Sequence, residues 1–195
     1  MSPISDRIVS VLGVWPPGRL VLARNVPEHA KRGRLNVAGC RWDKALCQQH
    51  LDNLKRSDRG AWAMMNALIE ESEDRGLPID QHGDGYAAPV GERVKPTEFR
   101  GRPTPWLGEL RVEERTPRRR SALGNTAHHR LYFGEPNDPD DLVMALLLDS
   151  KRGRDPLALI KQTKAMVNAM WALMKWCEGR DPATGWREWD WSVYR

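Results

Sequence analysis

The sequence predicts an α+β fold, with two helices ahead of a small antiparallel sheet and a third helix after it. Apolar residues recur at helical spacing through residues 41–76 and again through 155–179. Between these stretches lie three apolar segments, 106–114, 128–135 and 142–149, which are separated by turn-forming residues. Short links between strands favour an antiparallel meander, so we expect these strands to pair in chain order.

Residues 1–40 are predicted to be an N-terminal extension. The run of residues 20–23 is typical of a short strand, and residues 29–34 form a basic turn. The rest of the chain divides into a main domain, residues 41–179, and a tryptophan-rich tail, residues 180–195.

Residues 41–76 are expected to form an αα-hairpin. Asp58 is the expected N-cap of the second helix, and Gly76 its stop signal. The apolar positions are Trp42, Leu46, Cys47, His50, Leu51 and Leu54 in the first helix, and Trp62, Met65, Leu68 and Ile69 in the second.

Residues 77–105 show no clean periodicity, and we predict a long connection there. Of the three strands, the third is almost wholly apolar, which favours a central position buried on both faces. Asp155 and Pro156 are expected to cap and open the last helix, which runs to Gly179.

The predicted last helix and the tail supply further apolar groups. The faces of the helix carry Leu157, Ile160, Lys164, Val167, Trp171, Met174 and Lys175, and we expect Trp171 and Trp176 in the core. The tail contains Trp186, Trp189, Trp191 and Tyr194. Such a tail more often folds back over apolar surface than stacks on nucleic-acid bases, and we favour the first reading.

The bulk composition narrows the class of protein. With 31 Lys and Arg against 26 Asp and Glu, the net charge is +5, which is weak evidence for a nucleic-acid partner. Three cysteines argue against a disulfide framework and for a reducing cytosol. The sequence has no apolar run long enough for a membrane span and no signal-peptide pattern, so we expect a cytoplasmic protein with no membrane contact.

Successive predicted strands carry cationic and phenolic side chains. Arg111 lies in the first, Arg130 and Tyr132 in the second, and Lys151 follows the third. Arg130 and Tyr132 point to the same side because strand side chains alternate. These groups could form one basic cluster on the sheet, chemically suited to hold a phosphodiester and neutralise its charge. The alternative is that both arginines simply face solvent.

His128 and His129 must face opposite sides of their strand, so at most one of them joins the cluster. A histidine has a pKa near the physiological range, which makes His129 a credible base. The simpler reading of each is a hydrogen-bonded structural histidine.

Four segments carry a resemblance to a known family. They are the helix end Glu70–Pro78, the segment Leu107–Arg111 with its Glu-Leu-Arg core, the segment Arg130–Phe133, and Leu147–Lys151 followed by Asp155-Pro156. In this order, from Trp42 to Gly179, the chain resembles the RelE superfamily of bacterial toxins, within it the HigB group and its phage-derived relatives. The loop 113–128 is longer than usual, and Arg152 stands where the family has a second lysine.

The resemblance implies an α+β fold of the RelE type and a toxin that cleaves messenger RNA, usually in the ribosomal A site, without metal or cofactor. The ribose 2′-hydroxyl would attack the adjacent phosphate. Arg111 and Arg130 would clamp the phosphate, Lys151 would stabilise the transition state, and Tyr132 or His129 would transfer a proton or stack on a base. Arg118, Arg119, Arg120, Arg152 and Arg154 would contact RNA. The implied partners are messenger RNA, the ribosome, and an antitoxin with a helix-turn-helix.

Other interpretations remain open at this point. The same fold could serve as a non-catalytic binding module for a protein or nucleic acid, as in gyrase-directed relatives, or as an inactive phage accessory protein. The arginine run 118–120 is most often a solvated loop. Cys40, Cys47 and His50 do not match a common zinc spacing, and Asp80, His82 and Asp84 fit a polar turn better than a metal site.

Overall fold

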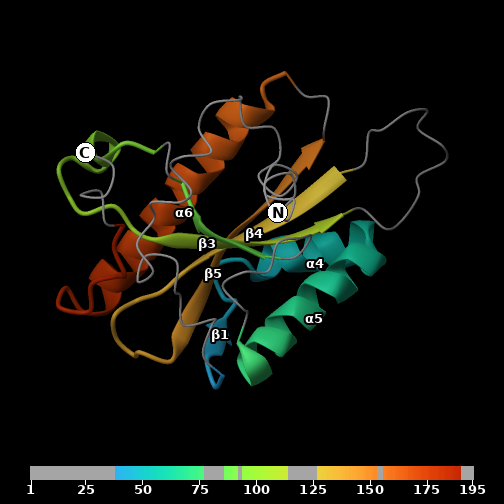
Figure 1. Cartoon of the computed structure of the whole chain (residues 1–195), viewed down its shortest axis with the longest axis horizontal. Helices are drawn as coiled ribbons and strands as arrows, with labels where there is room; N and C mark the ends of the chain where they lie inside the picture. The colour runs from blue at the N-terminus through green and yellow to red at the C-terminus, as the bar shows by residue number, and fades with distance from the viewer. Residues whose placement is uncertain (1–37, 77–85, 92–93, 114–126, 153–155, 190–195) are drawn as a thin grey trace, which may run out of the picture.

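The computed structural model describes residues 38–76, 86–91, 94–113, 127–152 and 156–189, and within them the fold is α+β (Figure 1). The sheet has five strands in the order β1-β5-β4-β3-β2. The strands are β1 (Arg41–Asp43), β2 (Tyr86–Val90), β3 (Leu107–Glu113), β4 (Ala127–Gly134) and β5 (Leu142–Arg152). The helices are α4 (Gln48–Ser57), α5 (Arg59–Arg75), the short 3₁₀ helix η2 (Pro96–Phe99) and α6 (Ala158–Arg180).

Strands β3, β4 and β5 form the expected antiparallel meander, and β1 adds to β5 in parallel. The expectation of a central third strand is confirmed, because β5 lies between β1 and β4 and its residues 143–146 are buried. The link between β4 and β5 is too short for anything but a hairpin, whereas the parallel pairing of β1 with β5 uses the whole intervening chain as its crossover.

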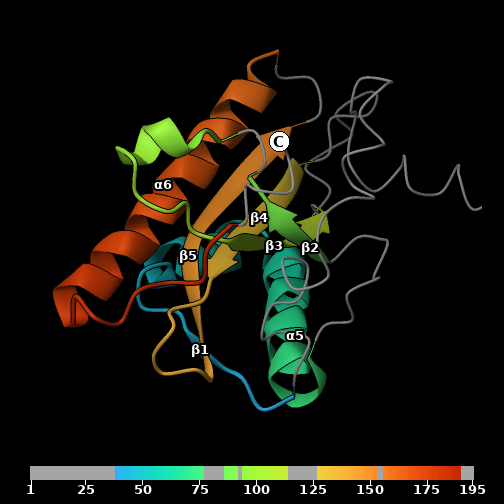
Figure 2. The ribbon, with the colours of Figure 1, turned by 60° about the vertical axis from the view of Figure 1, so that its left-hand side comes forward.

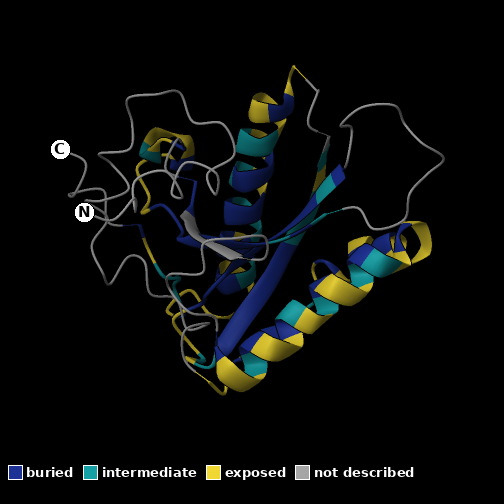
Figure 3. Cartoon of the chain, turned by 45° about the vertical axis from the view of Figure 1, so that its right-hand side comes forward, coloured by how far each residue is buried: buried dark blue, intermediate teal, exposed yellow. Residues whose placement is uncertain are grey.

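Helices cover both faces of the sheet (Figures 1 and 2). On one face, α4 and α5 pack over a core that includes Met65, Ile69 and Phe133. On the other, α6 packs over Tyr132 and Met144. Figure 3 shows the inner side of α6 buried and the outer side of α5 exposed, as expected of amphipathic helices that each cover one sheet face.

Phe133 is the centre of the core on the α4–α5 face. Its ring meets Trp42 edge-on at a centroid distance of 5.3 Å and Trp106 at 5.9 Å. It also lies over Gly108, its partner on β3, where an added Cβ would fall 2.0 Å from the ring. Any side chain at position 108 would therefore displace the phenyl ring.

The expected signals between and after the first two helices are confirmed. The Asp58 carboxylate accepts a hydrogen bond from the Ala61 N–H at 3.0 Å, as an N-cap does. Gly76 follows α5 at φ 70°, and its N–H donates to the carbonyl of Ser72. The apolar stripe of α5 is confirmed too, with Met65 and Ile69 fully buried and Trp62 and Leu68 packed at the margin.

The prediction that Trp42 belongs to the first helix is wrong. Trp42 lies in β1, and its indole N–H donates to the Ser72 hydroxyl at 2.7 Å. The chain then turns, with the Asp43 carboxylate accepting from the Ala45 N–H, before α4 begins at Gln48. A few apolar residues satisfy helical and strand spacing equally, so periodicity could not locate this boundary.

The connection 77–105 contains a strand that was not predicted. β2 runs beside β3 at the edge of the sheet. Its sequence, Tyr-Ala-Ala-Pro-Val, includes Pro89, which argues against a strand except at an edge, where a missing N–H costs no ladder bond. Asp80, His82 and Asp84 lie outside the described residues.

The predicted N-cap of α6 is wrong. The helix begins at Ala158 with Leu157, not Asp155, at the N-cap position. Leu157 and Ile160 are 51% and 67% exposed, because the buried stripe is built from Ala165, Met166, Ala169, Met170, Leu173, Met174 and Cys177. Alanine contributes little contrast to a hydrophobic pattern, yet small residues let a helix lie close to a sheet. Trp171 and Trp176 are half-buried at the edge of this core.

The expectation that the tail folds back is confirmed as far as Trp189. Trp189 is buried, and its backbone N–H donates to the carbonyl of Thr104 at 2.8 Å. Arg187 bonds the buried Glu135 at 3.2 Å and lies over the Trp106 ring. Trp191 and Tyr194 lie outside the described residues, as do residues 1–37. No helix in the described parts of the chain is long and apolar enough to cross a membrane.

Candidate anion-binding site

The meander brings polar side chains together on the face that α6 covers. In register, Arg111 on β3 lies opposite Arg130 on β4, which lies opposite Asp149 on β5. Tyr132 is buried against α6. Arg130 is two residues from Tyr132 on the same strand, so its side chain points to the same face. We call Arg111, Arg130 and Lys151 the basic cluster. Both arginines bond the carboxylate of Glu109, and Lys151 lies on the same face of the sheet, diagonal to Arg130 across β4 and β5.

Glu109 is the centre of the basic cluster and is fully buried. One of its oxygens, Oε1, accepts from Arg130 Nη1 at 2.7 Å and also from Arg111 Nε. The carboxylate therefore holds both guanidinium groups in fixed orientations. In the sequence, Glu109 stands out only as part of the Glu-Leu-Arg motif. The signal that points to its role is its position two residues before Arg111, on the same face of the strand.

Lys151 joins the cluster from the end of β5. Its ammonium donates to Gln162 Oε1 on α6 at 3.4 Å. Partial burial and then the positive charge of Arg130 lower the pKa of Lys151, and Glu109 opposes them in part. A lysine whose pKa is lowered releases a proton more readily, which is useful in a proton donor.

Tyr132 lies beneath the cluster with no exposed surface. Burial and the charge of Glu109 raise the pKa of its phenol. Its hydroxyl and Glu109 Oε2 both lack a hydrogen-bond partner among the described residues. The structure brings Tyr132 to the cluster, as expected, but seals it from solvent, so that it does not reach a bound substrate in this conformation.

His129 does not join the cluster. It faces the α4–α5 side with Leu131 and Phe133, and its Nδ1 lies 2.8 Å from the Ser150 hydroxyl. The neighbouring His128 is on the cluster side, opposite Lys151 in register, with Nδ1 3.8 Å from Glu113 Oε1. The prediction that His129 shares a face with Arg130 and Tyr132 is therefore wrong. Strand side chains alternate, and it is His128, two residues from Arg130, that lies on the side of the cluster.

The cluster carries a modest excess of positive charge. Its three cations outnumber the two carboxylates on the same face, those of Glu109 and Asp149. His128 and Glu113 lie beside each other and are left out of this count. The expected RNA contacts Arg118, Arg119, Arg120 and Arg154 lie outside the described residues, as does the side chain of Arg152. The cluster could bind one anion through fixed guanidinium groups and supply one labile proton.

The three cysteines do not offer a nucleophile. All are buried, and burial raises the pKa of Cys40 to about 11, of Cys47 to about 12 and of Cys177 to about 11. Thiols with such pKa values stay protonated near neutral pH. Within the described residues, no three His, Cys, Asp or Glu side chains are grouped as a metal ion would need.

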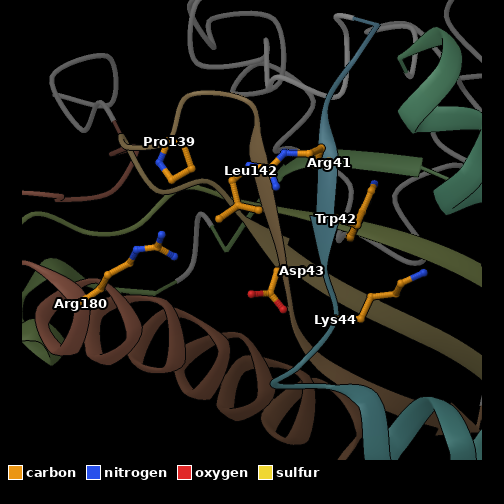
Figure 4. A pocket seen from close by; sticks show the side chains of 7 residues that line it. All are labelled: Arg41, Trp42, Asp43, Lys44, Pro139, Leu142 and Arg180. Carbon is orange, nitrogen blue, oxygen red and sulfur yellow. The ribbon is translucent and has the colours of Figure 1, made fainter.

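Two surface hollows lie near these elements. One, of about 290 Å³, separates β1 from the end of α6 and is lined by Arg41, Lys44, Asp43 and Arg180 (Figure 4). Its cations are already engaged in part, because Arg41 forms a two-pronged ion pair with Asp141. The other, of about 180 Å³, is mostly apolar, lies between α5 and the end of β3, and is lined in part by Arg111 of the basic cluster.

Comparison with protein-family models, with curated proteins and with solved structures finds no match for this chain.

Proposed function

We propose that this protein is a metal-independent endoribonuclease that acts as a toxin by cleaving messenger RNA. The observation that carries the proposal is the position of Arg111, Arg130 and Lys151 on one face of three adjacent strands, with both arginines bonded to the buried carboxylate of Glu109. Fixed cations at one point of a sheet are suited to a phosphodiester, whose charge increases in the transition state.

The proposed fold is of the RelE type. The order of helix pair, three-stranded meander and helix is the order on which the sequence resemblance rests. The Glu-Leu-Arg segment of β3, residues 109–111, supplies both the central carboxylate and one of its arginines. The segment Arg130–Tyr132 of β4 supplies the second arginine and the phenol beneath it.

In the proposed reaction the ribose 2′-oxygen attacks the adjacent phosphorus while the bond from phosphorus to the 5′-oxygen breaks. The products are a 2′,3′-cyclic phosphate and a free 5′-hydroxyl. His128 takes the proton from the 2′-hydroxyl, and Lys151 gives one to the leaving 5′-oxygen. Arg111 and Arg130, held by Glu109, hold the non-bridging oxygens. Tyr132 supports the cluster from below and transfers no proton.

The proposed cellular setting follows the resemblance. Messenger RNA on the ribosome is the substrate, the cytoplasm is the location, and an adjacent helix-turn-helix antitoxin is the inhibitor. No cofactor has a part in the scheme.

The test is cleavage of a synthetic RNA, free and on programmed ribosomes, by purified protein. A 2′-deoxy nucleotide at the cleaved position should abolish the reaction. Lys151→Ala and His128→Ala should each lose about 100-fold or more in rate, since general acid–base groups typically contribute that much. His129→Ala, on the other side of the sheet, and Arg41→Ala, at the far edge, should cleave normally.

A wild-type cleavage rate in Lys151→Ala, or no cleavage of either free or ribosome-bound RNA, would contradict the proposed endoribonuclease activity. One observation favours a second candidate, a binding module without chemistry: the guanidinium groups already bond Glu109, and Tyr132 is sealed. Growth arrest that persists in folded Lys151→Ala and Arg130→Ala variants would support that module, with folding checked by circular dichroism.

A further inference from the structure

The outer face of α6 carries a stripe of lysines. Lys161, Lys164 and Lys175 are exposed, with Asn168 between them, opposite the buried stripe of the helix. At 1.5 Å per residue the stripe extends about 21 Å. In the whole helix the only acidic residue is Glu178.

A second segment lies against α6 and adds to the same charge. Residues 94–103, which include η2, pack on the helix where the Phe99 ring meets Trp171 at a centroid distance of 5.4 Å. Figure 2 shows this segment alongside α6. It brings exposed Lys95 and Arg100, and Arg102, which pairs with Glu178. The one acid of the helix is thereby engaged by a neighbour.

The positive charge of this surface is not balanced locally. Among the described residues, neither Lys164 nor Lys175 takes part in an ion pair, and Glu98 is the remaining acidic side chain of the two segments. Arg100 also adopts a left-handed backbone conformation, φ 53°, that favours glycine. A charged side chain therefore occupies a position where it carries a backbone cost.

We propose that α6 and residues 94–103 form a binding surface for the backbone of single-stranded RNA. We call these residues the α6 surface: Lys95, Arg100, Arg102, Lys161, Lys164 and Lys175. A row of like charges about 21 Å long matches a polyanion with regularly repeated phosphates better than it matches a small ligand.

The α6 surface adjoins the basic cluster. Lys161 begins the lysine stripe, and the next residue, Gln162, accepts the hydrogen bond from Lys151. An RNA chain held at the cluster can therefore continue onto the outer side of α6. This inference rests on the proposed function for the identity of the RNA, but its binding test does not need cleavage.

The experiment measures binding of a 20-nucleotide unstructured RNA at several salt concentrations by fluorescence anisotropy. A triple variant, Lys161→Gln, Lys164→Gln and Lys175→Gln, should bind about tenfold more weakly at low salt. Its slope of log affinity against log salt should fall by about 2, because each phosphate contact on a single strand contributes about 0.7. Saturated with RNA, the variant should cleave at the wild-type rate.

The matched control removes three cations from the other helical layer: Lys55→Gln, Arg56→Gln and Arg59→Gln. It has the same net charge as the α6 variant and should bind as wild type does. Equal weakening in both triples, an unchanged salt slope in the α6 triple, or equally strong competition by poly-L-glutamate of matched charge would overturn the proposal.

Arg100→Gly separates binding from stability. Glycine relieves the left-handed conformation, so the variant should be at least as stable as wild type in urea, yet bind the RNA less tightly. Unchanged RNA binding in this variant would remove residues 94–103 from the surface.

If wild-type protein cleaves no RNA but the triple variants still differ in binding, the proposed enzyme fails and the α6 surface stands. If wild-type protein cleaves RNA but the two triple variants bind RNA equally well, the proposed enzyme stands and the α6 surface fails.

Discussion

The two helical layers of this protein cover opposite faces of one sheet. They differ in the charge of the helices themselves and in the polar groups that are buried beneath them. Helices α4 and α5 together carry four basic and five acidic residues, whereas α6 carries four basic and one acidic. Beneath α4 and α5 the buried polar side chains Ser72 and His129 bond to near neighbours, and one ion pair, Glu135 with Arg187 of the tail, lies at the margin of this core over the Trp106 ring. Beneath α6 lie the ion pairs of Glu109 with two arginines.

This difference separates two tasks. The layer of α4 and α5 stabilises the sheet through apolar packing and through the capped N-terminus of α5. The layer of α6 also packs apolar side chains on the sheet, but it encloses charged groups as well, which cost free energy to bury unless they are paired. Such groups are where a fold departs from the simplest stable solution, and they are candidates for function.

The largest effect is expected from Glu109→Ala. It leaves Arg130 buried without its carboxylate, and removing one partner of a buried ion pair typically costs about 3–5 kcal/mol. Urea unfolding followed by circular dichroism measures the loss. Glu113→Ala, at a half-exposed carboxylate on the same strand, should change stability by less than about 0.5 kcal/mol.

The double variant Glu109→Met with Arg130→Met sharpens this result. Removing both charges should restore much of the stability lost in Glu109→Ala while abolishing RNA cleavage. Equal stability of Glu109→Ala and wild type would mean that the α6 side holds no buried charge network, and the contrast between the layers would disappear.

A smaller effect is expected on the other side of the sheet. Asp58→Ala removes the N-cap of α5 and should cost about 1 kcal/mol. Asp58→Asn should retain most of that stability, because the amide oxygen can accept the same hydrogen bond. Both variants should leave RNA cleavage and binding unchanged, as measured in the assays above. Loss of cleavage in folded Asp58→Ala would show that the α4–α5 layer also serves function.

The smallest effect is a pH dependence at Lys151. Its pKa in the folded protein is below the ordinary value of 10.5, so the unfolded chain binds more protons between these two values. The free energy of unfolding should therefore rise with pH between the folded pKa and 10.5. Below the folded pKa, the partly buried charged amine destabilises the folded protein by a constant amount.

Lys151→Met lacks this dependence. At pH 7 it should be slightly more stable than wild type, within about 0.5 kcal/mol, and the difference should shrink as pH rises to 10. The urea midpoints of wild type and Lys151→Met are compared at pH 7, 8, 9 and 10. The contributions of all other titrating groups cancel in the difference between the two proteins. A difference that grows with pH would mean that the folded pKa is raised, and would remove the case for Lys151 as a proton donor.

Much of the fold was determined by local sequence. The Asp58 cap, the Gly76 stop and the stripe of α5 act over one or two turns, and the strands of the meander are bounded by turn-forming residues; all could be predicted. β1 and β2 could not. A three-residue strand has no periodicity of its own, and a strand with Pro89 is acceptable only because it lies at an edge that the tertiary structure creates.

For the candidate site, the sequence determined which side chains can share a face, because alternation along a strand is a local property. It thus placed Arg130 with Tyr132 and separated His128 from His129. Only the tertiary structure decided which of those faces lies under α6, how deeply each group is buried and that Glu109 joins the two arginines. Register between strands and burial depend on contacts across long stretches of chain, and no local pattern contains them.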